Sequence, residues 1–148
     1  GYPTNEEELA IIEGQQVAHP IDTLEAVTNA KEIIELQESV RHIFVDDLIK
    51  QYIVTVVDAT RDHPDIALGA SPRGSLALFR GGQALALIRD RDFVLPDDVK
   101  ELTASMLSHR VIVSAAARMR GIKASEIIDN IVSEIPVPGA QAADRARR

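Results

Sequence analysis

The residues best suited to chemistry form a short run, Gly69-Ala70-Ser71-Pro72-Arg73. Ser is a preferred N-cap and Pro is favoured at the first helical position, so Ser71 and Pro72 predict a helix start. Arg73 then lies in the first turn, where the helix dipole disfavours a cation and favours an anion. A guanidinium fork beside free backbone N–H groups suits a phosphate. We interpret Arg73 as a phosphate-contacting candidate; the alternatives are a solvated arginine or one paired with a carboxylate such as Asp65.

Other chemistry finds little support in the sequence. The same run begins like a G-x-S-x-G nucleophile elbow, but Arg73 replaces the last glycine and no strand is predicted before it. No GxxxxGK[ST] or GxGxxG motif occurs, the four histidines lack HxxH or HExxH spacing, and there is no Cys. The acidic pairs Asp46-Asp47 and Asp97-Asp98 fall at predicted helix starts, where the dipole accounts for them. We therefore expect no catalytic residue and no metal site in this chain alone.

Composition limits the classes of partner. The chain has 148 residues, five aromatic residues and a net charge of -7, which suggests one domain with an aliphatic core. The negative charge argues against a nucleic-acid partner, and no apolar run is long enough to span a membrane. The sequence begins without Met or a signal peptide, so we expect a cytoplasmic protein and a segment of a longer chain.

Hydrophobic periodicity is helical nearly throughout and predicts an all-α bundle of about five to six helices. Residues 93–95 and 110–114 are predicted to pair as a minimal two-stranded β ribbon. The fourth helix, which carries Arg73, is apolar nearly all round and is predicted to be buried. Its Gly81-Gly82 pair is expected to allow close approach of another backbone. The predicted helices cover residues 4–14, 28–40, 46–62, 71–89, 96–107 and 124–134.

The run at 69–73 and the helix after it resemble the sensor-2 region of the MoxR branch of AAA+ ATPases. The likeness continues in order from residue 1 to about residue 138. The segments that carry it are Gly1-Tyr2-Pro3, Val45-Asp46-Asp47, Ala59-Thr60-Arg61 with His63-Pro64, Ser75-Leu76-Ala77-Leu78, Gln83-Ala84-Leu85-Ala86-Leu87, Arg91-Asp92-Phe93-Val94, Pro96-Asp97-Asp98-Val99, His109-Arg110 and Ile135-Pro136-Val137-Pro138.

This resemblance implies a helical AAA+ lid domain at residues 1–135, similar also to the lid of the magnesium chelatase ATPase subunit, and a disordered tail at residues 136–148. It implies that Arg73 is the sensor-2 arginine, which contacts the terminal phosphates of the nucleotide. ATP and Mg²⁺ would be bound through an upstream core with the Walker A and Walker B elements, which this chain lacks. The chain alone would not be an enzyme, whereas the longer protein would be an ATPase.

The implied partners are the upstream AAA+ core, neighbouring subunits of a ring that is commonly a hexamer, and a protein with a von Willebrand factor A domain. The implied function is chaperone-like remodelling or activation of protein complexes. Two positions depart from the family pattern: Gly81-Gly82 replaces residues that are more often Ala, and Lys123 replaces a capping Ser or Thr. The alternative interpretation is a free-standing helical interaction module without a nucleotide role.

Overall fold

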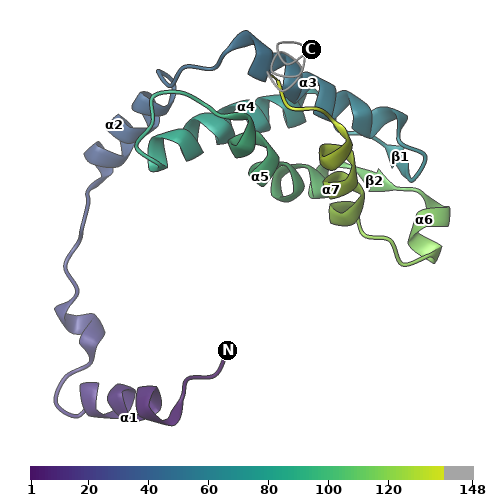
Figure 1. The fold of residues 1–148 in the computed structure, drawn as a ribbon. Helices are drawn as coiled ribbons and strands as arrows, with labels where there is room; N and C mark the ends of the chain where they lie inside the picture. The colour runs from purple at the N-terminus through teal and green to yellow at the C-terminus, as the bar shows by residue number, and fades with distance from the viewer. Residues whose placement is uncertain (139–148) are drawn as a thin grey trace, which may run out of the picture. The chain divides into compact units, whose positions relative to one another are not determined.

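The structure is a computed structural model that describes residues 1–138. Contacts divide the chain into two units, Gly1–Glu35 and Leu36–Arg148. The first contains helix α1 (Asn5–Gly14), a 3-10 helix (Pro20–Thr23) and the beginning of α2 (Ala30–Val40), which continues into the second (Figure 1).

Local hydrogen bonds, without burial, hold the helices of the first unit. Thr4 caps α1: its Oγ1 accepts from the Glu7 N–H at 3.3 Å, and the Glu7 carboxylate accepts from the Thr4 N–H at 2.7 Å. The Asn29 side chain accepts from the Glu32 N–H at 3.1 Å and begins α2. Every residue from 1 to 35 is exposed. The sequence correctly predicted the Thr4 cap.

The second unit is mainly helical, which confirms the all-α fold class. The described residues form seven α-helices, one more than the six predicted from the sequence. The additional helix is the short α6, which Ser114 caps. The elements in chain order are α3 (Asp47–Asp62), β1 (Ile66–Leu68), α4 (Pro72–Ile88), α5 (Pro96–Leu107), a 3-10 turn (Ser108–Arg110), β2 (Ile112–Val113), α6 (Ala115–Met119) and α7 (Ala124–Glu134).

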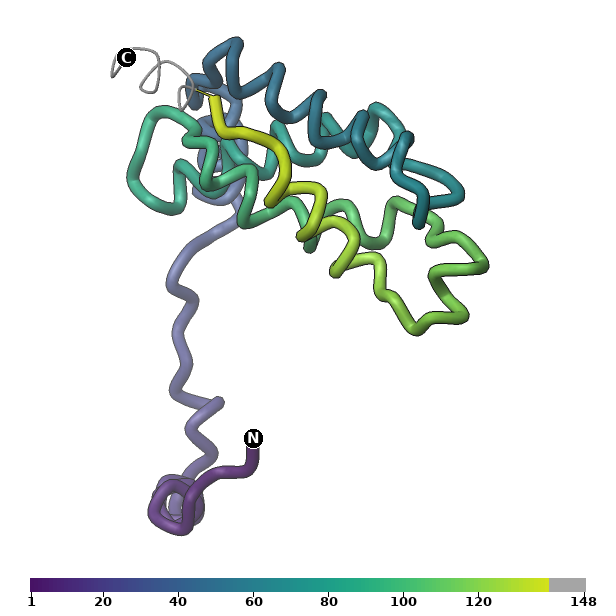
Figure 2. The backbone as a smooth tube through the Cα atoms, turned by 45° about the vertical axis from the view of Figure 1, so that its right-hand side comes forward, coloured from purple at the N-terminus to yellow at the C-terminus, as the bar shows by residue number. Residues whose placement is uncertain are grey.

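The predicted β ribbon has a different partner in the structure. Strand β2 pairs antiparallel with β1, through Ile66 with Val113 and Leu68 with Ile112. Figure 2 shows the two chain segments that contain these strands side by side. Phe93 instead forms an isolated parallel bridge with Phe44. The prediction was wrong because the 12 residues of α5 separate the segments 93–95 and 110–114. A helix of that length spans about 18 Å, and β2 follows its far end after only a short 3-10 turn, so the chain does not return to residues 93–95.

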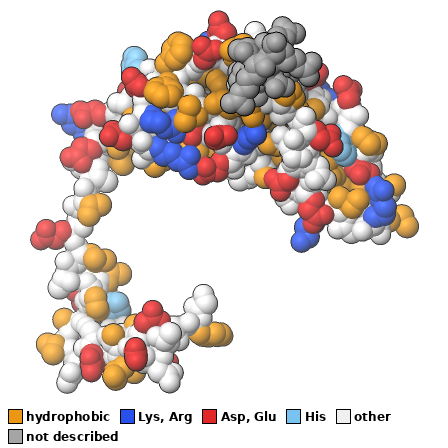
Figure 3. All heavy atoms as spheres, viewed as in Figure 1, with side chains coloured by type: hydrophobic (Ala, Val, Ile, Leu, Met, Phe, Trp, Pro, Cys, Tyr) orange, Lys and Arg blue, Asp and Glu red, His pale blue; other side chains and the backbone are white. Residues whose placement is uncertain are grey.

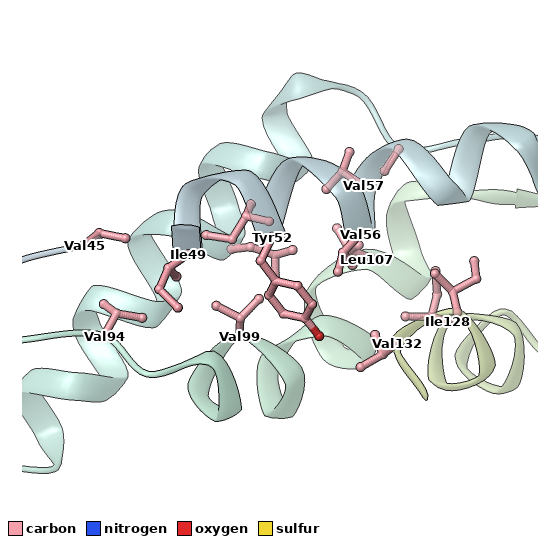
Figure 4. Packing of buried hydrophobic residues seen from close by; sticks show 14 of the residues in the cluster. Val45, Ile49, Tyr52, Val56, Val57, Val94, Val99, Leu107, Ile128 and Val132 are labelled. Atoms are coloured by element: carbon pink, nitrogen blue, oxygen red, sulfur yellow. The ribbon is translucent and has the colours of Figure 1, made fainter. Parts of the chain in front are cut away.

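The core lies among α3, α4, α5 and α7 (Figure 4). Val56, Leu78, Val99 and Leu107 are completely buried. The sequence predicted that α4 is buried on all sides, and this is wrong for one face. Leu76 of α4 is 63% exposed at the surface. The further members of the core are Ile43, Val45, Ile49, Tyr52, Ile53, Val57, Ile66, Ala70, Ala86, Val94, Ile127, Ile128, Ile131 and Val132.

The glycine pair of α4 makes room for side chains rather than for a backbone. A Cβ at Gly81 would lie 2.3 Å from Met106 Cε, and a Cβ at Gly82 would lie 3.1 Å from Val94 Cγ1. The pair therefore lets α5 and the segment before it pack closely against α4.

The predicted tail falls mostly outside the described residues, which end at residue 138. Within them, residues 136–138 line a groove of about 310 Å³ with Leu48, Gln51, Tyr52 and Thr55 of α3. Burial first, and the negative charge of Asp97 second, raise the pKa of Tyr52 above its ordinary value.

Candidate functional site

The loop before Arg73 is fastened to the end of α3. Thr60 Oγ1, which is completely buried, accepts from the Ala70 N–H at 2.9 Å, and Arg61 Nε donates to the Ala70 carbonyl at 3.1 Å. A Cβ at Gly69 would lie 2.6 Å from Arg61 Cα, so the two backbones meet closely there. These contacts fix where α4 begins, and so fix the backbone of Arg73.

Arg73 lies in the first turn of α4, as predicted, and its side chain is exposed. Among the described residues it forms no hydrogen bond or ion pair. Asp65, the partner considered from the sequence, forms an ion pair with Arg120 instead. Arg73 is thus free to contact a group from outside this chain.

The backbone at the start of α4 offers fewer donors than the sequence suggested. Ser71 occupies the N-cap position, but its side chain makes no capping hydrogen bond. Pro72 has no N–H, and the Gly74 N–H donates to the Ser71 carbonyl at 2.7 Å. Gly74 is itself buried against Leu107 and Ala70. The guanidinium of Arg73 is therefore the main feature of this end that suits an anion.

The first acidic pair behaves as its position at a helix start predicts. Asp46 accepts from the Leu48 N–H at 2.8 Å and caps α3. Asp47 accepts from Lys50 Nζ at 2.8 Å, and this hydrogen bond, together with the charge of Lys50, lowers the pKa of Asp47. Both carboxylates stabilise the helix without any further chemistry.

The second acidic pair contains a network that the sequence did not reveal. Asp98 is 1% exposed and accepts from Arg91 at 2.6 and 2.9 Å, from Arg89 at 3.1 Å and from the Leu95 N–H at 2.8 Å. Arg89 also bonds Glu101. Burial opposes ionisation of Asp98, but the hydrogen bonds from Arg91 and Leu95 and the charges of both arginines outweigh it and lower its pKa.

This network joins the end of α4 to the start of α5, and both oxygens of the buried Asp98 carboxylate are taken by Arg89, Arg91 and the Leu95 N–H, so we assign it a structural role. The only signal in the sequence was the three-residue spacing from Leu95 to Asp98, which fits a helix-start hydrogen bond. Nothing in the spacing indicated that Arg89 and Arg91 would turn back toward Asp98.

Two histidines stabilise turns. Nδ1 of His63 accepts from the Asp65 N–H at 3.1 Å, and Nδ1 of His19 accepts from the Ile21 N–H at 3.2 Å. Within residues 1–138, no group of three or more His, Asp or Glu side chains is placed to hold a metal ion. None of the helices described there has the length and apolar character needed to cross a membrane.

The fold and the run at 69–73 agree with comparisons to known proteins. The AAA lid domain family matches residues 58–131, which is half of the chain and includes Arg73. The chain belongs to the AAA lid domain family. This confirms the resemblance inferred from the sequence and the fold that it implied.

The relatives are MoxR-family proteins and a similar solved structure. The chain is 44% identical over 145 residues to the uncharacterized protein YeaC of Bacillus subtilis, covering 98% of this chain and 45% of that protein. It is 32% identical over 151 residues to the chaperone MoxR1 of Mycobacterium tuberculosis, covering 96% and 40%. A candidate ATPase from Cytophaga hutchinsonii superimposes with a TM-score of 0.80 at 26% identity, covering 93% and 44%. The chain thus spans less than half the length of these relatives.

Proposed function

We propose that this chain is the lid of a MoxR-type AAA+ ATPase and that Arg73 is its sensor-2 residue. In this proposal an upstream core binds ATP and Mg²⁺, and Arg73 contacts the terminal phosphates of the nucleotide. The lid transmits the state of the nucleotide around a ring of subunits. The cycle drives chaperone-like remodelling of protein complexes, with a von Willebrand factor A domain protein as a partner.

One observation carries the proposal: Arg73 is exposed and without a partner among the described residues, while its backbone is fixed by the Thr60 and Arg61 bonds to Ala70. A cation held at the positive end of a helix dipole is electrostatically unfavourable, and a bound anion relieves this repulsion. A terminal phosphate would pair with the guanidinium, and its negative charge is favoured at the positive end of the helix dipole. Charge that develops on the transferred phosphoryl group is then offset by the arginine.

The test uses the longer protein with Arg73→Ala. Removal of one preorganised charged donor is expected to lower ATP turnover by about 10²-fold. Arg118→Ala is the matched control, because Arg118 is an exposed arginine on a different helix, α6. Both variants should keep the wild-type circular dichroism and melting temperature. Wild-type turnover in the Arg73→Ala protein would refute the sensor-2 role.

The lid assignment has its own test. The purified 148-residue chain should show no ATP turnover, because the sequence has no Walker A motif. Turnover above a buffer blank, removed by Arg73→Ala, would show that the chain is an enzyme by itself and would overturn the assignment.

A further inference from the structure

The outer surface of the α3–α4 pair contains an apolar groove. Ile53 and Val54 of α3 and Leu76 and Phe79 of α4 line it, with Lys50 and Ser75 at its edge, and it encloses about 280 Å³. Val54 is 59% exposed and Leu76 is 63% exposed. Two large aliphatic side chains this exposed on neighbouring helices form a surface suited to a further apolar side chain.

Cations border this groove. Arg73 and Arg80 lie three residues before and four residues after Leu76, so both neighbour it on the exposed face of α4. The Arg80 guanidinium lies over the Phe79 ring, 5.3 Å from its centroid. Lys50 stands on the α3 side and is paired with Asp47. Because Asp47 offsets the charge of Lys50, the positive charge beside Leu76 comes from Arg73 and Arg80, and it favours a ligand that combines apolar and acidic side chains.

The chain itself contains a segment with that chemistry. Residues 1–30 hold six carboxylates and neither Lys nor Arg. Eight carboxylates and one Lys give residues 1–35 a charge of -7, whereas fifteen acidic and fifteen basic residues cancel in residues 36–148. On the face that Figure 3 shows, acidic and apolar side chains gather in the N-terminal part without Lys or Arg. The net charge of the whole chain thus resides in its first 35 residues.

Helix α1 presents these groups in a pattern that fits the groove. Leu9 and Ile12 lie one turn apart and are 56% and 65% exposed. Glu13 follows Leu9 by four residues, and Glu8 precedes Ile12 by four, so a carboxylate lies beside each apolar side chain. Neither carboxylate has an ion-pair partner among the described residues. The helix has no buried residue of its own.

We propose that the groove of one copy docks helix α1 of a second copy. Leu9 and Ile12 occupy the apolar groove against Val54, Leu76 and Phe79. Glu8 and Glu13 face the bordering cations Arg80 and Lys50. Because the two surfaces differ, the contact is head-to-tail: the copy whose groove is occupied still offers its helix α1, and the other copy still offers its groove. Such a contact can continue from copy to copy, and it gives a ring where the rotation between copies closes and an open filament where it does not. The proposal does not depend on phosphate binding by Arg73.

Cross-linking between single-cysteine copies tests the contact, because the 148-residue chain contains no native Cys. One batch carries Ile12→Cys and a second, differently tagged batch carries Leu76→Cys. Mild oxidation of the mixture should give a disulfide dimer that contains both tags. The matched control pairs Ile12→Cys with Met119→Cys, because Met119 is 90% exposed on α6, outside the groove. Equal yields of mixed dimer from the two mixtures would overturn the proposal.

A charge exchange makes the test independent of one pair of positions. Glu8→Lys with Glu13→Lys in the Ile12→Cys copy should lower the yield of mixed dimer several-fold, because like charges then meet. Lys50→Glu with Arg80→Glu in the Leu76→Cys copy should restore it. Raising the salt concentration should reduce the yield of mixed dimer from the pair of copies that keep their native charged residues. If neither exchange alters the yield, α1 is not the occupant. Arg73 stays unchanged throughout, so the sensor-2 proposal is tested separately.

Discussion

The two units of the chain are stabilised in different ways. Gly1–Glu35 has helices held by capping hydrogen bonds, no buried residue and the whole net charge of the chain. The unit that begins at Leu36 has an aliphatic core and balanced charges, and the buried side chains of Thr60, Gln83, Asp98 and Thr103 are hydrogen-bonded within it. Short helices that bury nothing are only marginally stable in water. The difference indicates that the second unit is stabilised by its own packing, whereas the apolar side chains of the first unit have no core of their own among the described residues.

Truncation of a leucine in each unit should show the largest difference. Leu78→Ala removes a completely buried side chain of α4 and is expected to lower the free energy of unfolding by about 3–5 kcal/mol. Leu9→Ala acts on a side chain that is 56% exposed, and a change within about 0.5 kcal/mol is expected. Urea unfolding followed by circular dichroism measures both. Equal losses would mean that α1 has a buried apolar face in solution.

The Asp98 network should give the next largest effect. Asp98→Asn leaves Arg89 and Arg91 facing a neutral side chain, which is expected to cost about 3 kcal/mol of unfolding free energy. This value is at the low end of the range for breaking a buried ion pair, because the Arg89 and Arg91 side chains are 42% and 20% exposed to solvent. The control is Asp47→Asn, which breaks an exposed ion pair and should lower the free energy of unfolding far less than Asp98→Asn. A loss no larger than the control would show that the network contributes no stability.

The same carboxylate predicts a pH dependence. Because the pKa of Asp98 is lower in the folded state than its ordinary value of 3.8, the unfolded state binds its proton first as the pH falls. The stabilisation is present above pH 3.8 and is lost as the pH falls from there through the folded-state pKa. Unfolding free energies measured between pH 6 and pH 2 should therefore fall less steeply in Asp98→Asn than in the wild type. Parallel curves would contradict the assignment.

Replacing one glycine in each unit by alanine should have smaller and contrasting effects on stability. Gly69→Ala places a Cβ 2.6 Å from the Arg61 backbone, and the strain is expected to lower the free energy of unfolding by about 1–3 kcal/mol. At Gly14 the nearest atom to a new Cβ is Pro20 Cγ at 3.9 Å, so Gly14→Ala should leave the unfolding midpoint unchanged and slightly raise the helix content. A neutral Gly69→Ala would show that the loop can move away from α3.

Two capping positions give the smallest effects. Thr4→Ala removes a capping box and should destabilise α1 locally by about 1 kcal/mol, seen as faster amide hydrogen exchange in residues 5–14. Ser71→Ala acts at a cap position without a side-chain hydrogen bond and should change unfolding by less than about 0.5 kcal/mol. A larger effect at Ser71 than at Thr4 would reverse the assignment of the two caps.

Local signals were sufficient for most of the fold. Helical periodicity and capping residues predicted α1, α3 and α7 nearly to the residue, because both act within a few positions of the chain. The sheet could not be predicted in the same way: any short apolar segment can pair, and which segments meet depends on how α4 and α5 pack. Helix α6 was missed because its five residues are too few for a period.

The candidate site was predictable in position but not in detail. Ser71 and Pro72 gave the helix start, and the cation in the first turn singled out Arg73. The sequence did not show that Thr60 and Arg61 hold Ala70, because these contacts join residues nine and ten positions apart across a turn. It also overstated the backbone donors, since the Gly74 N–H is used by Ser71.

The bonds from Thr60 and Arg61 to Ala70 have a mechanical consequence. They make the start of α4 and the end of α3 one rigid piece, without a hinge between them. The Arg73 backbone can approach or leave a phosphate only when the whole helical unit moves. Motions of that kind take microseconds to milliseconds, whereas a free loop moves in nanoseconds to microseconds. In the proposed sensor-2 role, contact between Arg73 and a nucleotide would therefore report the position of the entire unit.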